Sequence, residues 1–278
     1  MSFARLCLLL ILPSLMVGCS LFDSGKSERE KLGLKGKVKT LTEYEGVAES
    51  NTLVQGNIIC RTTFDERGNQ TCVELFDEEG KLYEKRNTIY DENNRKTISE
   101  VYDVEGALER SLVFNYNENG YMTECEDFNG RGFLMYRASN TYDDLGRLTE
   151  NYITTHDGKF VGKTTMAYDE FGNDTLQLVF SDRFTVSRKE YRDYDADGYV
   201  SELNVYDSLD MRISQETYLY DKDGNMTERC TYSGYSVLED KAIIRYDEYD
   251  WCGNYRKALL YDKDSTLSGG TFRTIEYY

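Results

Sequence analysis

An aromatic residue recurs every 26 residues through most of the chain, and this spacing constrains the fold more than any other feature. These positions, called the first series here, run from Phe64 to Tyr246. Every one of them is aromatic, although aromatic residues make up only 13% of the sequence. Asp or Asn follows each ring, and Gly or Asn stands four residues after the ring in all but the last copy. Such a period is typical of repeat proteins, in which each repeat is one supersecondary unit.

A second, looser copy of the motif begins 12 residues after each first copy. Its ring positions, called the second series here, are Phe76, Tyr102, Phe128, Thr154, Phe180, Tyr206, Tyr232 and, after a three-residue insertion, Tyr261. Thr154 lacks the ring, and four units lack the glycine, those that begin at Phe180, Tyr206, Tyr232 and Tyr261. Two motif copies per repeat indicate two turns and therefore two strands per repeat.

The residue types of the motif are those that build a hairpin turn. Asp or Asn at the first turn position accepts hydrogen bonds from backbone N–H groups that follow, and Gly or Asn at the fourth tolerates positive φ. This combination predicts a type I turn closed by a left-handed residue, a common three-residue hairpin loop. We therefore interpret the recurring residues as structural, namely Tyr116, Tyr142, Asp143, Gly146, Tyr168, Asp169, Gly172, Tyr194, Asp195, Gly198, Tyr220, Asp221 and Gly224.

The segments between turns have the length and composition of strands, rich in Thr, Val, Tyr and Ile. The fold class expected is all-β, a long twisted antiparallel meander of about 17 strands that forms a single layer or a coiled strip. If Asp65 pairs with Asn69 across its loop, Phe64 lies opposite Gln70, and the same register places Tyr142 opposite Leu148. Because 12, 14 and 26 are even numbers, the rings of both series are expected on one face of the sheet.

The first 18 residues are typical of an export signal. Arg5 precedes an apolar run that is too short to span a bilayer. The end of this segment, Met16-Val17-Gly18-Cys19, resembles a bacterial lipobox, in which the cysteine is diacylated. This resemblance implies a signal peptide over 1–18 and a lipid anchor at Cys19, and an ordinary signal peptide is the alternative.

Residues 19–36 are polar and without period, which predicts a flexible tether, and 37–278 form the repeat domain. The net charge of -17 disfavours nucleic acid as a partner, because phosphate backbones are bound through Lys and Arg. The membrane is expected as a partner only through Cys19. No cofactor is expected.

The unit "YDDLGRLTE" from Tyr142 resembles the YD repeat of the Rhs family, and the chain as a whole resembles uncharacterised envelope lipoproteins of Bacteroidetes. The resemblance covers about 38–278 and implies a hairpin architecture in the cell envelope, at the outer membrane. Large Rhs proteins wind such strands into a shell around a toxin. This chain is too short for such a shell, so that function is not expected. Some YD-repeat proteins are described as carbohydrate-binding, which leaves a glycan ligand open.

Catalytic and metal motifs are not expected to operate here. His156 is the only histidine, which excludes two-histidine metal sites, and its place in a turn indicates an exposed loop residue. Asp193 to Asn204 has acids at calcium-loop positions but Asn204 where a bidentate Glu is needed. Cys60 and Cys72 fall on the two strands of one hairpin, on the same face and offset by two residues, which is a strained geometry for a disulfide.

The sequence thus favours a non-enzymatic envelope lipoprotein whose repeat sheet binds or scaffolds a protein partner. Two alternatives remain open: a glycan-binding lipoprotein, suggested by the rows of tyrosines, and an immunity or antitoxin protein, since an extended sheet can cover a toxin surface.

Overall fold

The computed structural model describes residues 26–278, and Cys19 with the predicted signal segment lies outside this range. The described residues form 18 strands and one short helix, which confirms the all-β meander with one strand more than expected. None of the helices in this range is long and apolar enough to cross a membrane.

The chain divides into two compact units. The first comprises the described residues up to Phe114, Asp127–Phe133 and Ile244–Tyr278, and the second comprises Asn115–Glu126 and Leu134–Ile243. The sequence predicts a single repeat domain over 37–278, and no composition change marks this division. Three strands have residues in both units, β6 (Leu108–Tyr116), β7 (Met122–Asn129) and β16 (Leu238–Tyr249).

The first unit contains the helical turn and the strands from both ends of the chain. These elements are α2 (Glu28–Lys31), β1 (Val38–Glu49), β2 (Thr52–Phe64), β3 (Gln70–Phe76), β4 (Leu82–Tyr90), β5 (Lys96–Tyr102), β17 (Tyr255–Tyr261) and β18 (Leu267–Tyr277). The second unit contains β8 (Leu134–Tyr142), β9 (Leu148–Thr155), β10 (Phe160–Tyr168), β11 (Asp174–Phe180), β12 (Val186–Tyr194), β13 (Val200–Asp207), β14 (Arg212–Tyr220) and β15 (Met226–Ser233).

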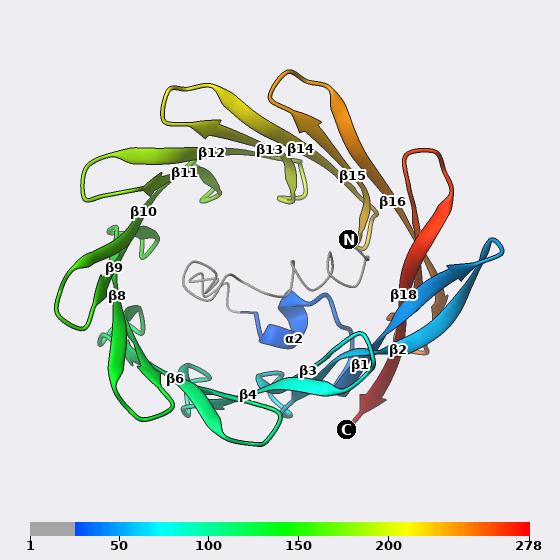
Figure 1. Ribbon diagram of the computed structural model, residues 1–278, viewed down its shortest axis with the longest axis horizontal. Coiled ribbons are helices and arrows are strands. Elements are labelled where there is room, and N and C mark those ends of the chain that lie inside the picture. Colours follow the sequence, from blue (N-terminus) through cyan, green and yellow to red (C-terminus); the bar gives the residue numbers. More distant parts are fainter. Residues whose placement is uncertain (1–25) are drawn as a thin grey trace. The chain divides into compact units, whose positions relative to one another are not determined.

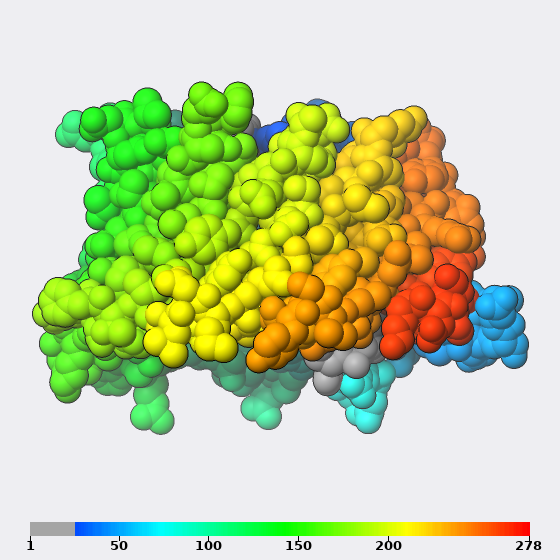
Figure 2. All heavy atoms as spheres, turned by 90° about the horizontal axis from the view of Figure 1, so that it is seen from above, coloured from blue at the N-terminus to red at the C-terminus, as the bar shows by residue number. Residues whose placement is uncertain are grey.

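In the second unit, each strand pairs with the next along the chain. All the pairs from β8–β9 to β15–β16 are antiparallel. The hairpins accordingly lie side by side in chain order, from green to yellow in Figure 1. Figure 2 shows the same hairpins as adjacent oblique bands of side chains.

In the first unit, the first and last strands of the chain pair with each other. β1 lies between β18 and β2, with Tyr44 opposite Phe272 and Gly46 opposite Gly270 (Figure 1). A simple meander would leave both terminal strands with a row of unpaired N–H and C=O groups. Here β1 and β18 each have a partner on both sides, so neither is an edge strand.

A small apolar cluster stabilises the junction of the two chain ends. Leu34, Val38, Leu41 and Phe64 are buried together, and Ile275 and Tyr277 of the last strand pack against them. Leu34 precedes the first strand and Phe64 ends the second. Residues from the first 40 positions and from the last five therefore share one core, which anchors the start of the repeat array.

The described part of the predicted tether is structured. Ser27 and Glu30 form a capping box around the one-turn helix α2, and the Arg29 backbone N–H donates to the carbonyl of Gly68 at 3.0 Å. The Arg29 guanidinium also donates to the Val38 carbonyl at 3.3 Å. Part of the segment 19–36 thus forms a capped helical turn that contacts the repeat domain. The Ser-x-x-Glu pattern is the local signal for this turn.

The register at the turns is as predicted. Phe64 lies opposite Gln70, and the same relation holds for Phe76 and Leu82, Tyr102 and Leu108, Tyr142 and Leu148, Tyr194 and Val200, and Tyr220 and Met226. The register then shifts by one residue before each of these rings: Thr63 lies opposite Cys72, so that Thr71 is an extra residue, a β-bulge.

The bulges overturn the prediction that all rings share one face. Each bulge moves the following strand by one residue, and a one-residue shift exchanges the two faces. The pairs Thr165–Leu178, Leu178–Lys189 and Lys189–Tyr206 show that Tyr206 points away from the face of Tyr168. We call the face of Tyr142, Tyr168 and Tyr194 the tyrosine face, and the other, with Phe180 and Tyr206, the opposite face.

The tyrosine face carries most of the buried side chains, whereas modest burial on both faces is expected from the sequence. On this face Leu148, Asn151, Ile153 and Thr164 are buried in the second unit, and Cys230 is a buried residue of the opposite face. The two faces of the sheet thus differ in solvent exposure, and the tyrosine face is the packed one.

The bulge also separates the two cysteines of the first hairpin. Cys60 lies opposite Leu75, and Cys72 lies opposite Thr63, so the two side chains are on different faces. The placement on one face predicted from sequence is therefore wrong, and both thiols are free. Burial raises the pKa of the Cys60 thiol to about 12, which makes it an inert core residue.

Candidate functional site

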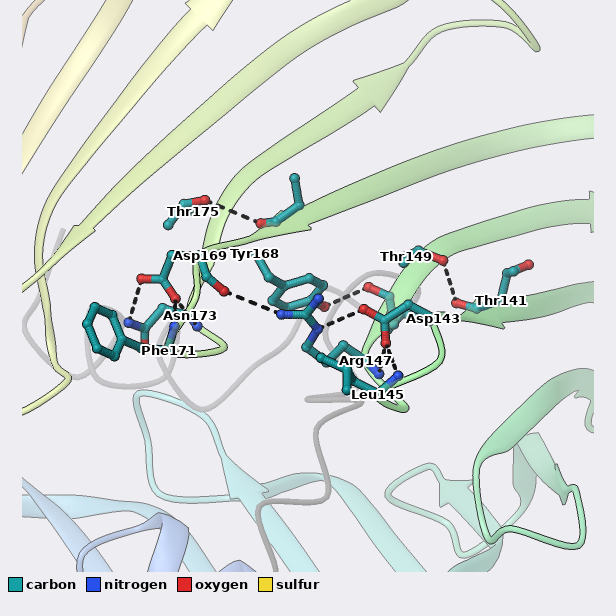
Figure 3. Close-up of polar contacts among 12 residues, drawn as sticks. Thr141, Asp143, Leu145, Arg147, Thr149, Tyr168, Asp169, Phe171, Asn173 and Thr175 are labelled. Carbon is teal, nitrogen blue, oxygen red and sulfur yellow. Dashed lines mark hydrogen bonds and ion pairs between the residues drawn. The ribbon is translucent and has the colours of Figure 1, made fainter.

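The turn at Asp143 shows what the recurring Tyr-Asp-Gly residues do. The Asp143 backbone N–H donates to the Arg147 carbonyl at 2.9 Å, and the Gly146 N–H donates to the Asp143 carbonyl at 2.9 Å. One carboxylate oxygen of Asp143 accepts from the N–H groups of Leu145 and Arg147, at 3.0 and 2.8 Å (Figure 3). Gly146 has φ +78°, in the left-handed region. The acid, the glycine and the backbone thus close one loop.

The same arrangement recurs at the other predicted turns of the second unit. Asp169 accepts from the N–H groups of Phe171 and Asn173 at 2.9 and 2.8 Å (Figure 3). Asp195 and Asp221 make the equivalent pairs of bonds, and φ is positive at Gly172, Gly198 and Gly224. Tyr116, Tyr142, Tyr168, Tyr194 and Tyr220 each end a strand directly before a turn.

The electrostatics of these acids follow from their use as hydrogen-bond acceptors. The Arg147 N–H lowers the pKa of Asp143, and the Arg147 guanidinium, 2.7 Å from the second carboxylate oxygen, lowers it further. At Asp169, burial raises the pKa, but hydrogen bonds from Asn173 and its neighbours outweigh burial and the pKa is lowered. Carboxyl groups held in the charged form in this way are poorly suited to donate a proton near neutral pH.

The tyrosine hydroxyls join each hairpin to the preceding one. The Tyr168 hydroxyl donates to the Leu148 carbonyl at 2.6 Å, and Leu148 lies opposite the ring of the preceding turn. The interval of 20 residues between donor and acceptor is repeated along the chain. It links Tyr90 to Gln70 at 3.0 Å, Tyr142 to Met122 at 2.7 Å, Tyr194 to Asp174 at 2.9 Å and Tyr220 to Val200 at 3.0 Å. We call these bonds the tyrosine staples.

Three of these rings also pack on the residue that ends the preceding turn. The Arg147 guanidinium lies 4.8 Å from the centre of the Tyr168 ring and donates to the Asp169 carbonyl at 3.3 Å (Figure 3). Where that residue is a tyrosine, two rings stack: Tyr121 on Tyr142 at 5.1 Å, and Tyr199 on Tyr220 at 4.9 Å. In Tyr142, Tyr168 and Tyr220, both the ring and the hydroxyl therefore make contacts within the sheet.

Two structural roles were missed from the sequence. The first is the staple itself, whose acceptor is a backbone carbonyl and leaves no side-chain signal. The second is a hydroxyl seven residues after the ring, which occupies the bulge and donates to the carbonyl eight residues before it. Thr71, Thr97, Thr149 and Thr227 make this bond at 3.2–3.3 Å. The recurrence of Thr at this position was the available signal.

A cluster of charged groups lies on the tyrosine face of the second unit. Arg192 contacts Asp174 at 3.1 Å, Glu190 at 2.6 Å and the Gln177 side-chain oxygen at 2.8 Å. Burial raises the pKa of Asp174, and Arg192 opposes this effect. Because Arg192 already bonds both acids and the amide, the cluster is a partly buried ion network within the sheet.

The weaker motifs do not assemble into a site. His156 is exposed in its turn, where its backbone N–H donates to the Met135 carbonyl at 3.0 Å. Within residues 26–278, no group of three or more His, Cys, Asp or Glu side chains is arranged to hold a metal ion. In the stretch that resembles a calcium loop, one carboxylate oxygen of Asp195 accepts hydrogen bonds from backbone N–H groups of its own turn.

Comparisons with known proteins give only distant structural similarity. No family model matches the chain, and no curated protein matches it. The chain is similar to a porin-like protein from Bacteroides uniformis with 14% identity and a TM-score of 0.45, covering 87% of this chain and 98% of that one. A porin-like protein from Bacteroides vulgatus has 10% identity, the same coverages and a TM-score of 0.32.

A similarity to a toxin component was also found. The pore form of the Photorhabdus luminescens Tc holotoxin has 12% identity and a TM-score of 0.34. The match covers 81% of this chain and 15% of that chain. This chain therefore spans a small part of the toxin chain's length.

Glycine substitutions should lower stability by different amounts in turns that look equivalent in sequence. A Cβ at Gly146 would lie 2.1 Å from the Tyr121 hydroxyl, whereas at Gly172 it would meet nothing within 4 Å. We expect Gly172→Ala to cost about 1 kcal/mol through its positive φ alone. Gly146→Ala should cost more, because Tyr121 must also leave its stack on Tyr142. Thermal and urea melts of the two variants measure the difference, and equal losses would contradict the steric term.

The tyrosine staple can be tested by removing one oxygen atom. Tyr168→Phe deletes the bond to the Leu148 carbonyl and keeps the ring on Arg147, so we expect a loss of about 0.5–1.5 kcal/mol in the free energy of unfolding. Tyr235→Phe is the matched control, because Tyr235 is 87% exposed, and should be neutral. Urea titrations of both variants decide the point; a neutral Tyr168→Phe would show that the staple contributes nothing.

Proposed function

We propose that this protein is a non-enzymatic lipoprotein of the bacterial cell envelope, anchored at the outer membrane through Cys19, and that its repeat sheet binds a protein partner. Two features of the described residues support this proposal. The recurring acids, tyrosines and glycines act in the turns, and a set of large apolar side chains on the strands is exposed to solvent.

The exposed strand residues carry the proposal. Met135, Val161, Tyr191, Ile213 and Leu219 are 39–59% exposed, and they lie on β8, β10, β12 and β14. The register places Tyr191 and Leu219 on the opposite face of the sheet. Met135, Val161 and Ile213 each stand seven residues after a second-series position, at the site where the first series carries its hydroxyl.

The chemistry of this set suits a protein surface. Single exposed apolar residues are ordinary, but Tyr, Met and aliphatic side chains that recur on successive hairpins form a binding surface of the kind found at protein interfaces. Polar residues stand between them, since the opposite face also carries Glu202, Asn204 and Gln215. A surface of this mixed composition fits a partner that the protein binds and releases.

The glycan alternative loses part of its basis. It depends on tyrosine rows that are free to stack on sugar rings, but the rings of Tyr142 and Tyr168 pack on the preceding turn and their hydroxyls donate to carbonyls. Among the second-series rings, Tyr206 already contacts Tyr191 edge to face at 5.5 Å. An immunity role would use the same exposed surface and is one form of protein binding.

Lipid anchoring is tested at Cys19. We expect Cys19→Ser to prevent incorporation of fatty-acid analogues and to release the protein from the membrane fraction, because a thioether-linked lipid requires the sulfur. Cys72→Ser controls for the loss of a cysteine elsewhere. If the Cys19→Ser protein still incorporates the analogue, the anchor is not at this residue.

Partner binding is tested on one strand of the exposed set. We expect the variant with Ile213→Asp and Leu219→Asp to lose capture of a partner from envelope extracts by the tagged full-length protein. Leu145→Asp, at a 75% exposed turn position, should retain capture and shows that added charge alone is harmless. Identical captured proteins for all three chains would contradict binding through the exposed strand residues.

A further inference from the structure

The last three second-series turns of the second unit lack the glycine of the repeat and expose several large apolar side chains. The turns at 181–185, 207–211 and 233–237 have no glycine at the fourth turn position, and Asp210 and Ser236 take the left-handed conformation there with φ +62° and +61°. The same turns present large apolar side chains to solvent. These are Phe184, Leu209, Met211, Tyr235 and Val237, which are 57–89% exposed, and we call them the apolar tips.

The three turns form a continuous row on one edge of the second unit. Adjacent turns of the row are two strands apart, which corresponds to about 10 Å. Side chains tie each turn to the next. Lys189 pairs with Asp210, and Arg212 bonds to Ser236 and donates to the Gly234 carbonyl at 3.4 Å. The positions of the tips relative to one another are therefore held by the sheet.

The opposite edge of the same unit is strongly acidic. Its turns at 117–121, 143–147, 169–173, 195–199 and 221–225 contain nine acidic and two basic side chains, a net charge of -7. The three turns of the apolar row contain three acidic side chains and one basic, a net charge of -2. Arg188, Lys189 and Arg212 stand on the strands directly after these turns. The unit thus has one strongly acidic edge and one edge that is less acidic and carries more exposed apolar side chains.

We propose that the apolar tips insert into the lipid–water interface of a phospholipid bilayer. A chain with a net charge of -17 is repelled by an anionic lipid surface, so it can approach one only through its least acidic edge. Aromatic and aliphatic side chains flanked by Arg and Lys are the residues that partition into this interface.

The spacing of the tips favours lipid over a protein as the occupant. The tips project from three separate turns, and neighbouring turns of the row are separated by about 10 Å. A protein partner would need a complementary pocket for each tip, whereas a bilayer accepts each apolar side chain independently. Ile213 of the exposed strand residues stands two positions after the tip Met211, but the two sets share no residue. The two proposals are tested with different variants, so they can fail separately.

The insertion is tested with tryptophan as a depth reporter in the full-length protein. Trp251 is the single native tryptophan and is first changed to Phe. Phe184→Trp then places a reporter in the apolar row, and Phe171→Trp places one on the acidic edge, at positions that are 89% and 83% exposed. Phosphatidylcholine vesicles with and without bromine on the acyl chains are the probe, and the protein is either anchored in them or added to them.

We expect a blue shift and bromine-dependent quenching of the emission for Phe184→Trp and neither for Phe171→Trp. Leu209→Trp should behave like Phe184→Trp, and thermal melts of all variants should match, since none of these side chains is packed. Quenching at both edges would overturn the orientation, because the acidic edge would then also reach the lipid. Absence of quenching at Phe184 and Leu209 would overturn the proposal, including the case in which a protein partner covers the tips.

Discussion

The hydrogen bond from a tyrosine hydroxyl to a carbonyl 20 residues earlier is the interaction on which the arrangement of the repeats depends. Ladder bonds pair neighbouring strands, but they leave the turns of successive hairpins free to splay. The Tyr168 hydroxyl removes this freedom, because it bonds to Leu148 at the start of the strand that follows the preceding turn. The bond is partly shielded from water, where an unmade partner would be costly.

The staple explains why the two series of turns differ in sequence. All first-series positions from Tyr90 onwards are tyrosine, whereas the second series contains Phe76, Phe128, Phe180 and even Thr154. A phenyl ring can fill space on the sheet, but only tyrosine can reach the carbonyl. Among the second-series tyrosines, Tyr102 makes a different contact: its hydroxyl donates to Glu100 on its own strand. Turns of the second series are therefore freer to change their loop residues.

Local parts of the structure could be predicted from sequence, because they depend on residues a few positions apart. The Asp–Gly turns and the opposition of Phe64 to Gln70 follow from the chemistry of a five-residue stretch. The bulge at Thr71 could not be derived in the same way, since it depends on a hydroxyl that meets a carbonyl on the neighbouring strand. Missing this single residue reversed the predicted face of the second-series rings and put Cys60 and Cys72 together.

The pairing of strands far apart in the chain could not be predicted from the repeat pattern, for a different reason. The pairing of β1 with β18 joins segments more than 200 residues apart. Neither "VKTLTEY" nor "TIEYY" contains a sequence feature that identifies the strand with which it pairs. Phe64 takes part both in a local turn and in the long-range junction of the chain ends. It begins the first series without a hydroxyl of its own, it is fully buried, and its carbonyl accepts from the Tyr278 hydroxyl at 2.6 Å. The first turn therefore accepts two tyrosine hydroxyls, the staple from Tyr90 at Gln70 and the bond from Tyr278 at Phe64, and the second of these also stabilises the junction of the chain ends.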